Sequence, residues 1–136
     1  MKKLLPFVFI IFFFSGCKKL IEKKAEDAII NAMTSGQWVI TSFSQNSTDI
    51  TSSFTGYKFQ YYSNKTVDAI KNNMVEKTGT WDGNASTLTI SANFTNVTEP
   101  LLLLNGNWHI DNNSWTFVIA SQNTGAETRS LRLDKQ

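Results

Sequence analysis

The sequence predicts an all-β domain: an eight-stranded antiparallel up-and-down barrel, preceded by a short N-terminal helix. Three observations support this prediction. Apolar residues recur with a period of two from Gly36 onward, polar turn residues interrupt the chain at short intervals, and no helical pattern lies between the expected strands. A two-sheet sandwich is the main rival, but it needs longer crossing connections than most of these turns provide.

The chain begins with the pattern of a secretory signal peptide. Two lysines precede an apolar run at 4–14, and a Ser-Gly pair then precedes Cys17, the only cysteine. The run includes a proline and is shorter than the roughly 20 apolar residues that a transmembrane helix needs. We therefore interpret 1–16 as a signal peptide that is removed before Cys17.

The cleavage junction resembles the lipobox of bacterial lipoproteins, with Phe14 at the position where Leu is usual. This resemblance implies that Cys17 carries lipid and becomes the mature N-terminus. Three acyl chains would exceed the two signals that stable anchoring requires. Lys18 follows the cysteine, in place of the Asp that signals inner-membrane retention. We expect a lipid anchor in the cell outer membrane, with the domain facing the periplasm and the membrane as its partner.

The charge of the mature chain excludes one class of partner. Without the two lysines of the signal peptide, 11 of the 13 basic residues remain against 11 acidic ones. A neutral domain with no basic stretch among its aromatics is not expected to bind nucleic acid. Because Cys17 is the only cysteine, no disulfide forms within the domain, and packing alone must hold it together.

The segment 17–35 is expected to be a lipidated cysteine and a helical leader. Apolar residues from Ile21 to Met33 fall on one helical stripe, and Gly36 follows as a helix terminator. The stripe is narrow and rich in alanine, whereas a membrane-surface helix shows a bulkier apolar face. We favour a helix that packs across one end of the domain.

The barrel domain is expected over 36–136. Its polar gap at 45–55 is interpreted as a mobile loop, and Asp111-Asn112-Asn113 as one of several turns. The strands between the turns are expected at 37–45, 55–62, 65–71, 74–82, 86–94, 101–110, 113–121 and 126–134.

A Gly-x-Trp pattern occurs three times in the domain. Glycine lets the backbone bend or lets a large ring lie over it, so each tryptophan is expected to fill space near a barrel end. The structural residues singled out by this pattern are Gly36 with Trp38, Gly79 with Trp81, and Gly106 with Trp108.

Gly36-Gln37-Trp38 stands at the start of the first strand after a short helix, where the lipocalin and calycin group has its signature. The chain thus resembles the small lipocalin-like lipoproteins of Gram-negative bacteria. The resemblance implies a basic residue near the last strand that stacks on Trp38. Arg129 and Arg132 are the candidates, and strand parity favours Arg129, which shares a face with Leu131. Such a cation–π contact is worth about 1–2 kcal/mol when desolvated.

The sequence contains few residues that could act in catalysis. His109 is the only histidine and is expected to face outward, and the carboxylates are scattered. No cluster of metal ligands, phosphate loop or nucleophile motif is present in the sequence. We expect no enzyme activity, no catalytic residue, no metal and no cofactor.

The residues expected to face inward are mostly aromatic and aliphatic, and they are compatible with a ligand pocket or with a filled barrel. They are Trp38, Ile40, Tyr57, Phe59, Tyr61, Trp81, Leu88, Ile90, Trp108, Ile110, Trp115, Phe117, Ile119, Leu131 and Leu133. A domain of this size needs most of its aromatics for its own stability, so a mostly filled barrel is favoured.

Two functional hypotheses follow. In the first, the protein binds a small hydrophobic ligand without catalysis, and Tyr57, Phe59, Tyr61 and Arg129 are the candidate ligand-binding residues. In the second, a filled barrel acts as an interaction module that contacts a protein or polysaccharide of the envelope through its outer face and the 45–55 segment. The sequence leaves the oligomeric state open.

Overall fold

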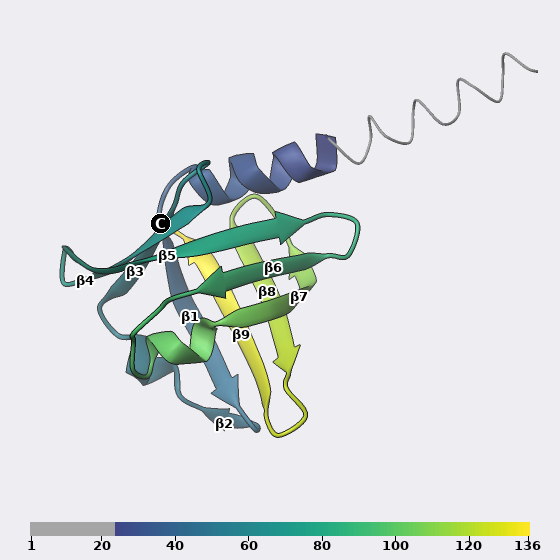
Figure 1. The fold of residues 1–136 in the computed structure, drawn as a ribbon. Helices are drawn as coiled ribbons and strands as arrows, with labels where there is room; N and C mark the ends of the chain where they lie inside the picture. Colours follow the sequence, from purple (N-terminus) through teal and green to yellow (C-terminus); the bar gives the residue numbers. More distant parts are fainter. Residues whose placement is uncertain (1–23) are drawn as a thin grey trace, which may run out of the picture.

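The structure is a computed structural model that describes residues 24–136, so the signal peptide and Cys17 lie outside the described residues. A helix over 24–34 precedes a closed antiparallel barrel, which confirms the predicted fold class (Figure 1). The barrel strands are β1 (Trp38–Gln45), β3 (Tyr57–Tyr61), β4 (Thr66–Lys71), β5 (Met74–Asn84), β6 (Thr89–Asn93), β7 (Gly106–Asn113), β8 (Phe117–Asn123) and β9 (Thr128–Lys135).

The strands pair in chain order, and β1 closes the barrel by pairing with β9. This seam runs from Trp38 opposite Lys135 to Gln45 opposite Arg129, with a bulge between Ile40 and Ser42. Between β1 and β3 a single register pair joins Trp38 to Phe59. A two-residue strand, β2 (Thr48–Asp49), folds back on the end of β1. The sheet is thus closed by an extensive β1–β9 seam and a much shorter β1–β3 contact.

Alternation along each strand places the core inside the barrel. In β3, for example, Tyr57, Phe59 and Tyr61 are buried while Lys58 and Gln60 are partly exposed. The same period of two holds in β7 and β9, and it is the pattern from which the strands were predicted. The aromatic interior is therefore dictated by the sequence itself.

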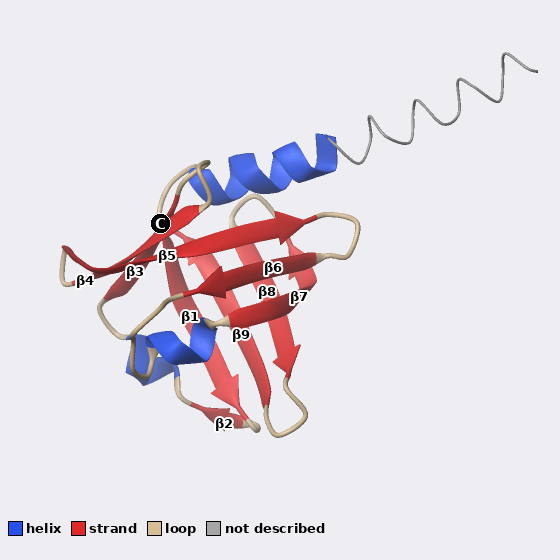
Figure 2. Ribbon diagram, viewed as in Figure 1, coloured by secondary structure: helices blue, strands red, loops and turns tan. Residues whose placement is uncertain are grey.

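The N-terminal helix lies across one end of the barrel (Figure 2). Met33 on its last turn is buried in the core, and Ile29 packs over Gly83 of β5 so closely that a Cβ there would lie 2.8 Å from the Ile29 Cγ2. The Lys135 ammonium also donates a hydrogen bond of 2.8 Å to the Ser35 hydroxyl. This confirms the prediction that the helix packs against the domain.

Two short 3₁₀ helices, η1 (Thr51–Phe54) and η2 (Leu101–Leu104), lie at the end opposite the N-terminal helix (Figure 2). Phe54 is buried and its ring centroid lies 4.8 Å from that of Phe43. The segment 45–55, expected to be a mobile loop, thus holds β2 and η1. The strand expected over 101–110 begins only at Gly106, because the leucine run before it coils into η2 and buries three of its side chains.

The β7–β8 hairpin differs from its predicted register. Asp111-Asn112-Asn113 belongs to β7, which bulges between Ile110 and Asn112, and the turn falls at 114–116 instead. The bulge and the later turn reverse the expected parity of β8. Val118 and Ala120 point into the barrel, while Phe117 and Ile119 are only half-buried.

Two further residues that were expected inside the barrel lie outside it. Trp115 sits in the β7–β8 turn with 60% of its surface exposed. Leu88 precedes β6 rather than belonging to it, and it is 49% exposed. Both residues come from turns at the end of the barrel that the helix covers.

Candidate functional site

The barrel interior holds a cavity of only about 40 Å³. Its lining is almost entirely apolar and includes Phe59, Tyr61 and Val67. Ligand sites of small molecules usually enclose about 300–1,000 Å³. A cavity of this size has room for little more than a water molecule or two. The described structure therefore has the filled barrel that the sequence favoured.

The aromatic ligand-binding candidates serve the core. Tyr57 does not line the cavity, and its ring centroid lies 6.5 Å from that of Phe54 and 6.1 Å from that of Phe59. Burial, with a hydrogen bond to Glu76, raises the pKa of Tyr57 to about 12. Burial alone raises the pKa of Tyr61 as well. Both phenols stay neutral at any physiological pH.

Arg129 lies at the barrel end away from Trp38. Its guanidinium donates to the Gln122 side-chain oxygen at 2.9 Å and to Glu127, and its Nε is buried without a partner. Gln122 in turn donates to the backbone carbonyl of Asn105 at 3.0 Å. These polar side chains close the end of the barrel beside η2.

The expected contact between Arg129 and Trp38 is wrong. The ammonium of Lys135 lies 5.0 Å from the Trp38 ring centroid instead. Parity correctly placed Arg129 on the inward face of β9, but the antiparallel seam pairs it with Gln45 at the far end of β1. Parity does not specify the position along the strand, and that position determines which cationic side chain lies over Trp38.

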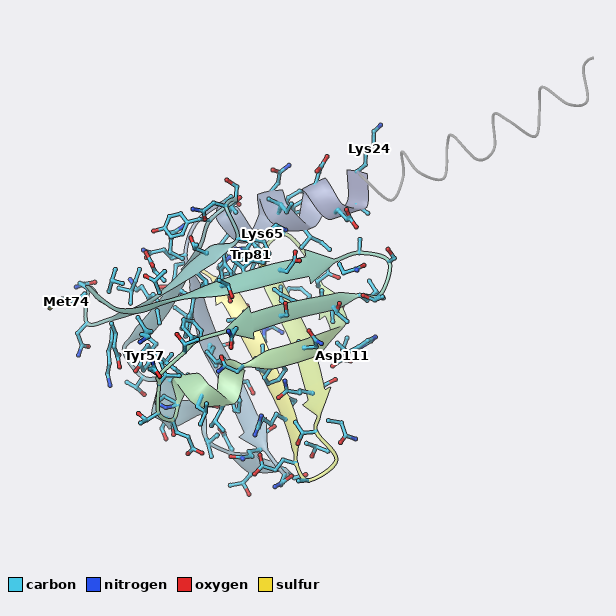
Figure 3. The ribbon with its side chains drawn as sticks, viewed as in Figure 1. Lys24, Tyr57, Lys65, Met74, Trp81 and Asp111 are labelled. Atoms are coloured by element: carbon cyan, nitrogen blue, oxygen red, sulfur yellow. The ribbon has the colours of Figure 1, made fainter. Side chains whose placement is uncertain are left out.

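The tryptophans of the three Gly-x-Trp segments share one function in the fold. Each is buried, and each indole N–H donates a 2.9 Å hydrogen bond to a backbone carbonyl of a segment that caps the barrel. Trp38 donates to Met33 at the helix end, Trp81 to Tyr62 in the β3–β4 turn, and Trp108 to Leu104 of η2. In Figure 3, Trp81 lies beside Lys65, whose ammonium is 5.2 Å from the ring centroid.

The glycines of these segments make room for other groups than the indoles. A Cβ at Gly79 would lie 2.7 Å from the Phe94 ring and 2.5 Å from the Asn93 carbonyl oxygen. At Gly36 the neighbour is the Lys135 side chain, and at Gly106 it is the Gln122 amide. At these three glycines, therefore, the nearest group is not the indole of the tryptophan two residues later.

A larger space lies outside the barrel, between the N-terminal helix and the β5–β6 and β7–β8 turns. This helix groove has a volume of about 440 Å³. In Figure 1 the two turns lie beneath the helix. The groove is lined by Ala25, Ala28, Ile29, Ala32, Ala85, Leu88, Ile110, Asn113, Ser114 and Trp115.

Leu88 and Trp115 are large, exposed apolar side chains that line the helix groove. Leu88 has a φ of +51°, a left-handed conformation that costs a bulky residue about 1–2 kcal/mol. A strained backbone that holds a large apolar side chain half in water is a feature from which function can be inferred. The sequence prediction placed both residues inside the barrel because it extended the strand alternation through the turns. The Ala-Ser-Thr and Asn-Asn-Ser runs that precede them are the signals of those turns.

A second concavity, of about 430 Å³, lies along β1, β7, β8 and β9. Its lining is polar throughout: Ser44, Ser47, His109, Ser121, Gln122, Asn123, Thr128, Arg129 and Ser130. His109 is exposed, as predicted, and its Nδ1 lies 3.0 Å from the Asp111 carboxylate.

Ser121, Asp111 and His109 do not form a nucleophilic triad. Hydrogen bonds from His109 and Ser121 both lower the pKa of Asp111, so the carboxylate accepts from both partners. In a triad the histidine, not the carboxylate, contacts the serine. Within residues 24–136, no three of the His, Cys, Asp and Glu side chains are grouped closely enough to hold a metal ion.

Among the described helices, none is long and apolar enough to cross a membrane.

Comparison with known proteins shows the fold alone. No protein-family model matches the sequence, and no curated protein matches it. A solved structure does match: the crystal structure of a DUF4847 family protein from Bacteroides vulgatus ATCC 8482. The two chains share 13% sequence identity with a TM-score of 0.55, over 79% of this chain and 99% of the other. The chain is thus similar in architecture to that Bacteroides protein, and at this identity the likeness extends to the fold.

Proposed function

We propose that this chain is a lipid-anchored, lipocalin-like protein of the cell envelope that binds a small hydrophobic molecule without catalysis. The binding site is the helix groove and not the barrel interior. The contrast in volume carries this proposal, because the groove offers about 440 Å³ and the interior about 40 Å³. Of these two spaces, only the groove falls within the usual range of small-molecule sites.

The groove chemistry suits an apolar ligand. Its lining contains no charged side chain, and its polar side chains are those of Asn113 and Ser114. Trp115 supplies an exposed aromatic surface, and burial of such a ring against a ligand is worth more than burial of an aliphatic group of ordinary size. An apolar lining with a few polar groups is the usual composition of a ligand site.

The fluorescence of Trp115 tests this proposal, since the other three tryptophans are buried and hydrogen-bonded. Titration with fatty acids, retinoids and haem should produce a saturable change in emission for at least one ligand. Leu88→Ala, in the groove, should weaken that binding. Val67→Ala, which enlarges the interior cavity, should leave it unchanged. A response lost in Val67→Ala and kept in Leu88→Ala would place the ligand inside the barrel and contradict the proposal.

The anchor is tested separately. Cys17→Ser should release a folded domain into the soluble fraction, because the lipid attachment is lost while the described domain is untouched. The measurement is fractionation of cell envelopes with detection of the protein. A variant that stays in the membrane fraction would show that the membrane association has another cause.

A second candidate function is an interaction module that contacts a polysaccharide through its outer face. The polar concavity on β1, β7, β8 and β9 favours it, because hydroxyl, amide and imidazole groups can exchange hydrogen bonds with sugar hydroxyls. Affinity electrophoresis in gels that contain envelope polysaccharide should retard the domain. Ser121→Phe should abolish the retardation, while Ser86→Phe, on the β5–β6 turn, should not. Equal mobility of all three proteins would exclude this candidate.

A further inference from the structure

We infer that the occupant of the helix groove is a single lipid acyl chain, drawn from the membrane to which the protein is anchored and laid along the N-terminal helix. This inference rests on the proposed function and names its ligand class.

The shape of the groove supports an extended ligand. One wall is the helix face formed by Ala25, Ala28 and Ala32, which spans about 10 Å at 1.5 Å per residue. Because these side chains are small, they leave a trough along the helix. Leu88 and Trp115 form the opposite side. A trough of this form accommodates a flexible chain lengthwise, whereas a rigid fused-ring molecule would need the helix to move away from Gly83, over which Ile29 is tightly packed.

The distribution of polar groups supports a ligand with one weakly polar end. Among the described residues that line the groove, the polar side chains are Asn113 and Ser114, and both belong to the β7–β8 hairpin. The rest of the lining is aliphatic or aromatic. An amide and a hydroxyl can hydrogen-bond an ester or carboxyl group but cannot neutralise a phosphate. The arrangement therefore suits an acyl chain whose charged head, if it has one, stays in water.

The short length of chain before the helix indicates the source of this ligand. Six residues, 18–23, separate Cys17 from the first described helical residue, Lys24. Even fully extended, the chain from Cys17 to Lys24 spans about 25 Å at roughly 3.6 Å per residue. The groove thus stays close to the bilayer surface, where acyl chains are the most abundant apolar groups.

Brominated lipids test the inference, since bromine quenches tryptophan emission on contact. The soluble Cys17→Ser protein is titrated with a monomeric brominated fatty acid, with vesicles of brominated phosphatidylcholine, and with retinol as a ring-bearing probe. We expect saturable quenching by the monomeric fatty acid, and its loss in Trp115→Phe, which removes the reporter. Ala28→Leu, which fills the trough, should raise the dissociation constant of the fatty acid, as measured by quenching, about tenfold or more. Asn31→Leu, on the same helix outside the groove, is the matched control and should bind normally.

The possible outcomes separate the inference from the proposal beneath it. If retinol perturbs Trp115 and the fatty acid does not, the acyl-chain inference is wrong while the groove remains a ligand site. If vesicles quench Trp115 but the monomeric fatty acid does not, the groove rim rests on the bilayer and admits no chain, so the inference is again overturned. If no probe affects Trp115 in a protein that unfolds cooperatively, the inference and the proposed function both fail.

Discussion

Trp108 and Trp115 show how differently one residue type serves this molecule. Trp108 is 3% exposed, and its indole N–H donates to the Leu104 carbonyl within η2. Trp115 is 60% exposed and lines the helix groove. The first ring stabilises the fold, and the second is available to a ligand. The sequence marks Trp108 by its Gly-x-Trp pattern and gives Trp115 no such context.

A pair of matched substitutions tests this difference. Trp108→Phe should reduce the free energy of unfolding by about 2–3 kcal/mol, because a buried carbonyl loses its donor and the smaller ring leaves a void. Trp115→Phe should change it by less than about 0.5 kcal/mol, as is usual for surface substitutions. Urea denaturation followed by far-UV circular dichroism measures both. Equal costs would contradict the roles assigned to the two rings.

Leu88 allows a second prediction at this scale. Leu88→Asn should leave the free energy of unfolding within about 0.5 kcal/mol of the wild type, because two effects of about 1 kcal/mol offset each other. Asparagine relieves the left-handed strain at φ +51°, while the half-buried leucine side chain is lost. The same denaturation experiment should show a loss of about 2–5 kcal/mol for Leu131→Ala in the core. A large loss for Leu88→Asn would mean that Leu88 is a core residue after all.

At the scale of elements, glycine sets how closely the helix and strands approach. Gly83→Ala should cost about 1–2 kcal/mol, because the new methyl group would lie 2.8 Å from the Ile29 Cγ2 and push the helix outward. Ile29→Ala in the same chain should remove that clash, so the double variant should be about as stable as Ile29→Ala alone. A double-mutant cycle by urea denaturation measures the coupling. Strict additivity would show that Ile29 does not pack on Gly83.

Gly79→Ala is the comparison within the same strand. Its Cβ would meet the Asn93 carbonyl oxygen at 2.5 Å, and backbone cannot move aside as a side chain can. We expect a larger loss of stability than for Gly83→Ala, and no rescue by Ile29→Ala.

The elements were largely predictable because strand periodicity is a local property. The alternation of Tyr57, Phe59 and Tyr61 on β3 is visible in the sequence, and all three residues are buried as expected. The failures lie where tertiary packing overrides the local pattern. The run Leu101–Leu104 looks like a strand, but after Pro100 it coils into η2, which places Leu101, Leu103 and Leu104 in the core at the barrel end.

At the scale of the whole molecule, an aromatic core makes stability depend on alkaline pH. Tyr57 has its pKa raised to about 12, and burial raises that of Tyr61, whereas both ionise near 10 in the unfolded chain. Their contribution to stability is complete below pH 10, because the phenols are then neutral in both states. Above pH 10 ionisation favours the unfolded chain, so stability should fall progressively toward pH 12.

Urea midpoints measured at pH 8, 10 and 11 test this expectation. Tyr57→Phe should give a shallower decline above pH 10 than the wild type, since one of the two raised pKa values is removed. An unchanged slope in Tyr57→Phe would show that Tyr57 ionises equally easily in the folded and unfolded states.

The candidate site was less predictable than the fold, and the reason is physical. Parity assigns Tyr57 and Phe59 to the interior, but it does not say whether that interior is full. The helix groove is formed by a helix and two turns that are far apart in the sequence, so no local pattern reveals it. Only the docking of Ile29 over Gly83 brings Ala28 opposite Leu88 and Trp115.

The three indole hydrogen bonds give each capping segment its own spectroscopic reporter. In an amide-region NMR spectrum, four indole N–H signals should be resolved, and only that of Trp115 should exchange with solvent at once. The protected signals of Trp38, Trp81 and Trp108 report in turn on the helix end, the β3–β4 turn and η2. The exchange rate of each indole proton would then measure the opening of its own segment, and the proton that exchanges first would identify the segment that opens first.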